Sequence, residues 1–129
     1  MNKEDFLQRT RAFGLRVIRL VERLTRNQTA QILGRQLLRS GTSVGANYRA
    51  ACRARSRAEF ASRIGVVAEE ADESLYWLEL MGEGNSVPKE ILSPLLNKAD
   101  ELTAIFTSGR RSASRPHQTS TIKHQTSTS

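Results

Sequence analysis

The sequence is poor in cysteine, histidine and aromatic residues. Cys52 is its single cysteine, which excludes an internal disulfide and is typical of a reducing compartment. The two histidines, His117 and His124, both lie near the C-terminal end. Because aromatic residues make up only 5% of the chain, we expect a hydrophobic core made largely of aliphatic side chains.

Long apolar segments are missing as well. No segment approaches the ~20 apolar residues that a membrane-spanning helix needs. The first ten residues, MNKEDFLQRT, contain no apolar core of the kind found in a signal peptide. We therefore expect a cytoplasmic protein without membrane partners. A chain of 129 residues is expected to form one domain.

Catalytic motifs are not found. Since histidine occurs only near the C-terminus, the Glu-x-x-His pairs of di-iron bundles and Ser-His-Asp or Cys-His arrangements are excluded from the rest of the chain. Cys52 lies among small residues and is interpreted as a packing residue. An enzyme would need a divalent metal held by Glu69, Glu70 and Glu73 alone. We favour a protein without catalysis, metal or cofactor.

Hydrophobic residues recur at intervals of three and four along four segments. Short breaks separate these segments, and none shows the alternation of a strand. The sequence therefore predicts an all-α protein, an antiparallel up-down four-helix bundle in residues 1–109. The predicted stripes are Phe6, Phe13, Val17, Leu20 and Leu24 in residues 3–24; Leu33, Leu37, Ser40, Val44, Asn47 and Ala51 in residues 29–52; Phe60, Ile64, Val67, Ala71, Leu75 and Leu78 in residues 56–81; and Leu92, Leu95, Ala99, Leu102 and Phe106 from residue 88 onward.

The predicted ends of these segments rest on capping signals. Ser56 and Glu59 have the spacing of a capping box at the start of the third segment. Gly109 stands where a glycine commonly ends a helix. Residues 110–129 are basic, rich in Ser and Thr and without apolar periodicity, so we expect a disordered tail. This tail contains HQTST twice, and its two histidines make at best a weak metal site.

Charge is distributed unevenly along the chain. Residues 1–63 carry 14 Lys and Arg against 4 Asp and Glu, whereas residues 64–109 carry 2 against 9. The tail adds 4 Lys and Arg without any Asp or Glu. Such a chain can bind polyanions, associate with another copy of itself, or do both.

The second segment contains QLLRSGTSVGANYRAA, in which poor helix formers share a helix with arginine. On a helical projection, the small residues at its apolar stripe allow close approach to neighbours, whereas its arginines lie on the opposite face beside Thr42 and Ala46. Asn47 on the seam needs a hydrogen-bond partner. Tyr48 is placed at the core edge, where packing is favoured over base stacking. Glu70 is placed to meet an arginine of another helix or subunit.

Arginines opposite an apolar seam often form only a solvated face. Here carboxylates are nearly absent among them, and arginine binds phosphate oxygens with two parallel hydrogen bonds. We therefore predict a polyanion-binding surface formed by Arg16, Arg19, Arg23, Arg35, Arg39, Arg49 and Arg53.

Three motifs carry a resemblance to a known family: residues 36–51, SRAEF at 56–60 and EEADESLYWLEL at 69–80. Together they resemble the four-helix-bundle proteins related to those encoded in 23S rRNA intervening sequences, over residues 9–108. The resemblance implies a homopentameric ring. The similar accessory variability protein of diversity-generating retroelements binds nucleic acid and a reverse transcriptase. The rRNA branch has Asn-Ile-Ala-Glu-Gly where this chain has NYRAA, and the tail lies outside the resemblance.

The sequence thus predicts a non-enzymatic oligomeric bundle that binds the phosphate backbone of RNA or DNA as an accessory protein. Its expected partners are further copies of itself, RNA or DNA, and a nucleic-acid-processing protein such as a reverse transcriptase. The alternative is a protein–protein adaptor whose charged faces serve self-assembly and a protein partner.

Overall fold

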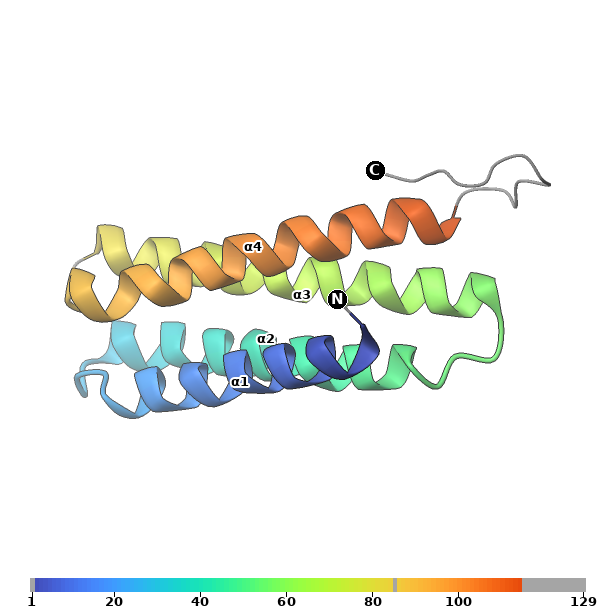
Figure 1. The fold of residues 1–129 in the computed structure, drawn as a ribbon. Coiled ribbons are helices and arrows are strands. Elements are labelled where there is room, and N and C mark those ends of the chain that lie inside the picture. The colour runs from blue at the N-terminus through green and yellow to red at the C-terminus, as the bar shows by residue number, and fades with distance from the viewer. Residues whose placement is uncertain (1, 85, 115–129) are drawn as a thin grey trace.

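Four helices account for nearly all of the described chain. The structure, a computed structural model, describes residues 2–84 and 86–114. The helices are α1 (Lys3–Glu22), α2 (Gln28–Ala51), α3 (Arg57–Glu83) and α4 (Lys89–Ser114), and these ranges with their turns contain no strand. Consecutive helices run antiparallel, so that α1 and α2 form one layer and α3 and α4 form the other (Figure 1). The predicted all-α four-helix fold is confirmed.

The predicted apolar stripes form the core between the two layers. Of the stripe on α4, all five residues are buried, and Phe13, Val17 and Leu20 are the buried members on α1. Most core side chains are aliphatic, as expected. The main aromatic cluster joins Phe6, Tyr48 and Phe106, with ring centroids 5.4 to 5.9 Å apart, so Tyr48 is confirmed as a packing residue. This cluster ties α1 and α2 to α4.

Glycine residues allow α1 and α2 to lie very close to one another. A Cβ atom added at Gly45 would be 3.3 Å from the backbone oxygen of Thr10. A Cβ atom added at Gly41 would be 2.8 Å and 2.9 Å from the two γ-methyl carbons of Val17. Gly14 on α1 faces the backbone of α2 in the same way. The predicted close approach is therefore confirmed, and glycines beside the apolar stripe of α2 make it possible.

Local hydrogen bonds offset the poor helix propensity of α2. The Thr42 hydroxyl donates to the Leu38 carbonyl at 2.7 Å, and the Asn47 amide donates to the Ser43 carbonyl at 2.9 Å. These bonds keep short polar side chains satisfied inside a helix. On the buried side, the Ser40 and Ser74 hydroxyl oxygens lie 2.9 Å apart and join α2 to α3. The partner predicted for Asn47 is thus found one turn away on its own helix.

One helix end was predicted correctly and another was not. Ser56 is the N-cap of α3, and its hydroxyl accepts from the Glu59 N–H at 3.0 Å. By contrast, α4 continues through Gly109 to Ser114, so the predicted cap at Gly109 is wrong. The added turn packs on α3, where a Cβ at Gly65 would be 3.1 Å from the Cδ of Arg110. The tail predicted to be disordered lies, from residue 115 onward, outside the described residues.

No helix in the described ranges is long and apolar enough to cross a membrane.

Candidate nucleic-acid interface

A groove runs along the outer surface between α1 and α2. It has a volume of about 710 Å³ and is shallow, because the close approach of the two helices forms its floor. We call it the α1–α2 groove. It is lined by Lys3, Glu4, Leu7, Gln8, Thr10, Arg11, Gly14, Leu15 and Ile18 of α1 and by Thr42, Gly45, Ala46, Arg49 and Arg53 of α2, with Cys52 at the end of α2.

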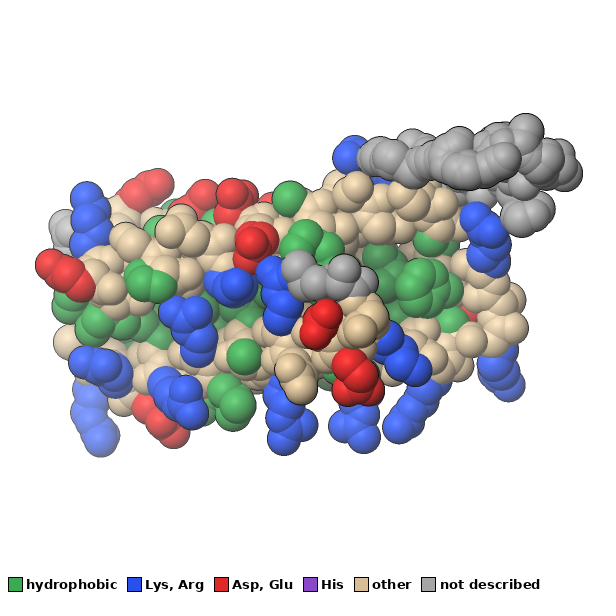
Figure 2. Space-filling model, in the orientation of Figure 1, with side chains coloured by type: hydrophobic (Ala, Val, Ile, Leu, Met, Phe, Trp, Pro, Cys, Tyr) green, Lys and Arg blue, Asp and Glu red, His purple; other side chains and the backbone are tan. Residues whose placement is uncertain are grey.

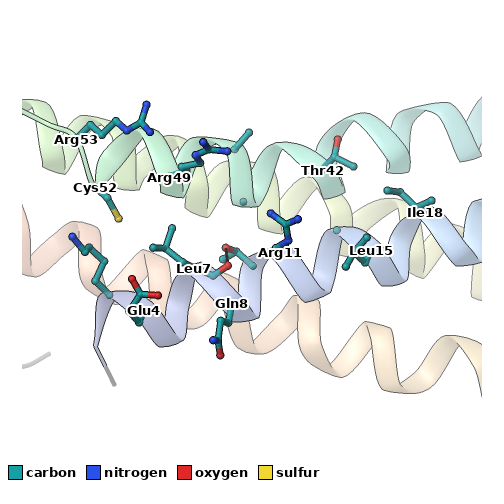
Figure 3. A pocket seen from close by; sticks show the side chains of 15 residues that line it. Glu4, Leu7, Gln8, Arg11, Leu15, Ile18, Thr42, Arg49, Cys52 and Arg53 are labelled. Carbon is teal, nitrogen blue, oxygen red and sulfur yellow. Dashed lines mark hydrogen bonds between the residues drawn. The ribbon is translucent and has the colours of Figure 1, made fainter.

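Cationic side chains gather at one end of the α1–α2 groove. Because the helices are antiparallel, the start of α1 lies beside the end of α2, which brings Lys3 and Arg11 near Arg49 and Arg53. Figure 3 shows Arg11 extending from α1 toward α2, beside Arg49. Glu4 is the one anionic residue of the lining, so the groove has a net charge of three positive. The net positive charge at this end of the groove attracts anions.

The groove arginines are available to a ligand. Arg11, Arg49 and Arg53 are exposed, and within residues 2–84 and 86–114 none of them forms an ion pair. An exposed guanidinium without a carboxylate partner keeps its full capacity for bidentate bonds to phosphate. Figure 2 shows the wider setting, with Lys and Arg gathered over α1 and many Asp and Glu along the α3–α4 side.

Cys52 lies at the cationic end of the groove but faces the aromatic cluster. Its thiol is partly buried beside Tyr48. Burial, with a further contribution from Cys52, raises the pKa of Tyr48 to about 12. The phenol is therefore neutral at physiological pH, as expected for a core side chain. This supports the packing role predicted for Cys52.

The seven arginines predicted as a binding surface do not form one continuous patch. Arg49 and Arg53 line the α1–α2 groove. Arg16 and Arg23 follow Arg9 by seven and fourteen residues, and Arg9 pairs with Glu101 of α4, so these two lie on the α4 edge of α1. Arg19 and Arg35 are exposed outside the groove, and Arg39 lies at the border with α3.

Arg39 has internal partners, contrary to the expectation that the arginines lack nearby carboxylates. Its guanidinium pairs with Glu70 at 3.3 Å and also with Glu73. Glu73 accepts a further hydrogen bond from the Trp77 indole at 3.1 Å. The prediction that Glu70 meets an arginine of another helix is therefore confirmed, and Arg39 joins α2 to α3.

The same contacts bear on the metal site considered for Glu69, Glu70 and Glu73. Two of these three carboxylates face Arg39, and Glu69 is exposed on the outer side of α3. In the part of the chain that the structure describes, no group of three or more His, Cys, Asp and Glu side chains is arranged to hold a metal ion.

The Arg39–Glu73 pair predicts an acid-sensitive contribution to stability. The hydrogen bond from Arg39 lowers the pKa of Glu73, so its stabilising effect is present above the ordinary carboxyl pKa of about 4.3 and is lost as the pH falls through the lowered value. Glu73→Gln should reduce the free energy of unfolding by about 0.5–1 kcal/mol at pH 7, because the pair is partly exposed.

Urea denaturation at pH 7 and at about pH 3 should show a smaller difference at the lower pH, because Glu73 takes up its proton as the pH falls through its lowered pKa. Glu69→Gln serves as the control, since Glu69 forms no ion pair within the described ranges, and we expect it to have little effect at either pH. A difference for Glu73→Gln that is equally large at both pH values would contradict the assignment.

Several groove residues, above all Arg11, are not among the residues predicted from the sequence. Leu7, Arg11 and Ile18 are spaced by four and seven residues and form a second, narrower stripe beside the main apolar stripe of α1. This stripe is visible in the sequence. Whether this stripe lines a groove depends on which edge of α1 faces α2, and the packing of the helices determines that.

Comparisons with known proteins identify a family and a similar solved structure. Residues 2–108 match the protein family described as 23S rRNA-intervening sequence protein. The chain is also similar to a crystal structure, at 1.70 Å resolution, of a protein with unknown function from the S23 ribosomal protein family from Bacteroides thetaiotaomicron. That similarity has 32% sequence identity and a TM-score of 0.78, and it covers 86% of this chain and 99% of the other. A search of curated proteins gives no match.

Proposed function

The chain belongs to the 23S rRNA-intervening sequence protein family, and from this premise and its α1–α2 groove we propose that it is a non-enzymatic accessory protein that binds the phosphate backbone of RNA or DNA. The observation that carries the proposal is the set of Lys3, Arg11, Arg49 and Arg53 along one groove, with three exposed arginines that have no ion pair inside the described chain. The reference to rRNA in the family description makes RNA the first ligand to test.

Self-association is part of the same proposal. The side of the molecule formed by α1 is rich in Lys and Arg, and the side formed by α3 and α4 is rich in Asp and Glu (Figure 2). Two surfaces of opposite charge suit head-to-tail contacts between copies. Such contacts form a ring when the rotation from copy to copy closes. The homopentameric ring implied by the resemblance is one such assembly. Arginines used in subunit contacts would not be available to phosphate.

The protein–protein adaptor is the second candidate function. It is favoured by Tyr76, whose side chain is 52% exposed on α3, next to Asp72 and Glu79 on the same outer face. Tyrosine is enriched at protein–protein interfaces, where a large rigid ring gives contact area at small entropic cost. In this case the charged faces serve assembly and a protein partner, and nucleic acid does not bind.

A titration against structured RNA and duplex DNA at two salt concentrations tests the proposal, with the native mass measured in parallel. If the four groove cations each meet a phosphate, raising salt fourfold should weaken binding by roughly 150-fold for duplex DNA and by roughly fiftyfold for unpaired RNA. Such binding by an intact oligomer supports the accessory function. No binding at low salt, with the oligomer intact, would contradict it and favour the adaptor.

A further inference from the structure

The α1–α2 groove changes chemical character along its length. Its cationic end carries Arg11, Arg49 and Arg53. Toward the middle of the helices the walls become apolar, with Leu15 and Ile18 on α1 opposite Thr42 and Ala46 on α2. Figure 3 shows the guanidinium groups in one half and Leu15, Ile18 and Thr42 in the other. A ligand that fills the groove must therefore present an anionic part next to an apolar part.

The two parts must be close together. Arg11 and Leu15 are separated by four residues, which corresponds to about 6 Å along a helix, on one face of α1. Leu15 is 44% exposed and is one of four large hydrophobic side chains in the described ranges that lie substantially in solvent. An exposed leucine one helical turn from a guanidinium group marks a surface that is stabilised when both are covered by one molecule.

A double helix and a single strand differ in what they offer such a groove. A duplex presents phosphates and sugars outward and keeps the flat faces of its bases stacked inside. An unpaired strand presents each phosphate beside a base whose apolar face is free. A duplex would meet the cationic end of the groove and leave Leu15 and Ile18 uncovered, whereas a single strand covers both.

Resting on the proposed function, we propose that the α1–α2 groove binds single-stranded nucleic acid, with phosphates at Arg11, Arg49 and Arg53 and an adjacent base on Leu15 and Ile18. The lining contains no aromatic side chain, so the base is held by van der Waals contact with aliphatic groups. Such contact distinguishes little between the four bases. The groove therefore selects unpaired over paired nucleic acid and has little sequence preference.

Fluorescence anisotropy with three ligands of equal length tests this proposal on the full chain. The ligands are a single-stranded oligonucleotide, the duplex of the same sequence, and an abasic strand that keeps the phosphates but lacks the bases. We expect the single strand to bind tightest, although the duplex has the higher charge density. The abasic strand should bind several-fold more weakly than the single strand, because only its phosphates contact the groove.

A pair of leucine and isoleucine variants separates the apolar contact from general effects. Leu15→Ser should weaken single-strand binding by roughly fivefold and leave abasic-strand binding unchanged. Ile32→Ser is the matched control, since Ile32 is 43% exposed on α2 outside the groove lining, and it should change neither affinity. Both positions are exposed, so neither substitution opens a cavity in the core.

The outcomes distinguish this proposal from the proposed function. Duplex binding as tight as single-strand binding, or an equal affinity for the abasic strand, overturns the single-strand proposal and leaves phosphate binding intact. A Leu15→Ser variant that binds the single strand as tightly as the unaltered chain also overturns it. Failure of all three ligands to bind at low salt overturns both proposals together.

Discussion

Replacing Arg49 and Arg53 together by glutamate is expected to weaken nucleic-acid binding by roughly ten- to a hundredfold while the bundle stays folded. Each substitution removes a phosphate contact at the cationic end of the α1–α2 groove and adds a repulsive charge. The dependence of log affinity on log salt should become shallower by about 1.4 to 1.8, the slope expected for two phosphate contacts. Both side chains are exposed, so circular dichroism and thermal unfolding should change little.

A second double variant, Arg19→Glu with Arg23→Glu, is the matched control. It changes the net charge by the same amount, on two exposed residues that do not line the groove, Arg19 in α1 and Arg23 directly after it. If the groove is the binding site, this control should lose much less affinity than the groove variant. Equal losses would mean that binding follows the overall positive charge and would contradict the assignment to the groove.

The same experiment separates the accessory protein from the adaptor. If Arg49 and Arg53 form subunit contacts, the groove variant should dissociate to a smaller native mass. If they bind phosphate, its native mass should equal that of the unaltered chain while its affinity falls. Unchanged mass together with unchanged affinity would leave neither role for these two arginines.

The fold was predictable because each helix carries its own apolar period. On α4 the spacing of Leu92, Leu95, Ala99, Leu102 and Phe106 identifies the buried face without knowledge of any neighbour, and all five are buried. A helix start was also predictable where a single capping residue determines it, as Ser56 does for α3. Both features depend only on residues that are close in the sequence, so the rest of the fold does not change them.

The C-terminal end of α4 was not predictable in this way. Gly109 satisfies a local rule for ending a helix, yet the helix continues because its last turn packs on α3. Gly109 itself sits near Ile64, and the side chain of Arg110 lies over Gly65. This packing on a segment more than forty residues away in the sequence overrides the local signal.

Individual arginines of the site were predicted less well than the basic character of the surface. The charge counts identified the basic half of the chain, and two of the arginines named from the sequence, Arg49 and Arg53, line the α1–α2 groove. Arg39 pairs with Glu70 and Glu73 because α2 and α3 place these side chains opposite one another. The role of Arg11 depends on its alignment with Arg49 across α1 and α2. Both alignments are set by the tertiary structure, which the pattern of one helix does not contain.

Two glycine-to-alanine substitutions are expected to change stability in opposite directions. At Gly41, the new Cβ would lie 2.8 Å and 2.9 Å from the γ-methyl carbons of Val17, which is closer than van der Waals contact allows. Val17 is fully buried and β-branched, so its methyl groups cannot rotate away and the helices must separate. Overpacking of this kind costs about 1–3 kcal/mol. After subtraction of the gain in helix propensity, we expect Gly41→Ala to lower the free energy of unfolding by about 1–2 kcal/mol.

At Gly109, in contrast, the new Cβ would lie 3.8 Å from the Cγ2 of Ile64, which is an ordinary contact distance. Alanine there gains helix propensity without a clash, so Gly109→Ala should raise the free energy of unfolding by up to about 1 kcal/mol. Urea denaturation of both variants measures the two signs side by side. A stabilised Gly41→Ala variant would show that α1 and α2 can separate at little cost. In that case Gly41 and Gly45 would not be the residues that hold α1 and α2 close together at the floor of the α1–α2 groove. The shape of the binding surface would then depend on other contacts.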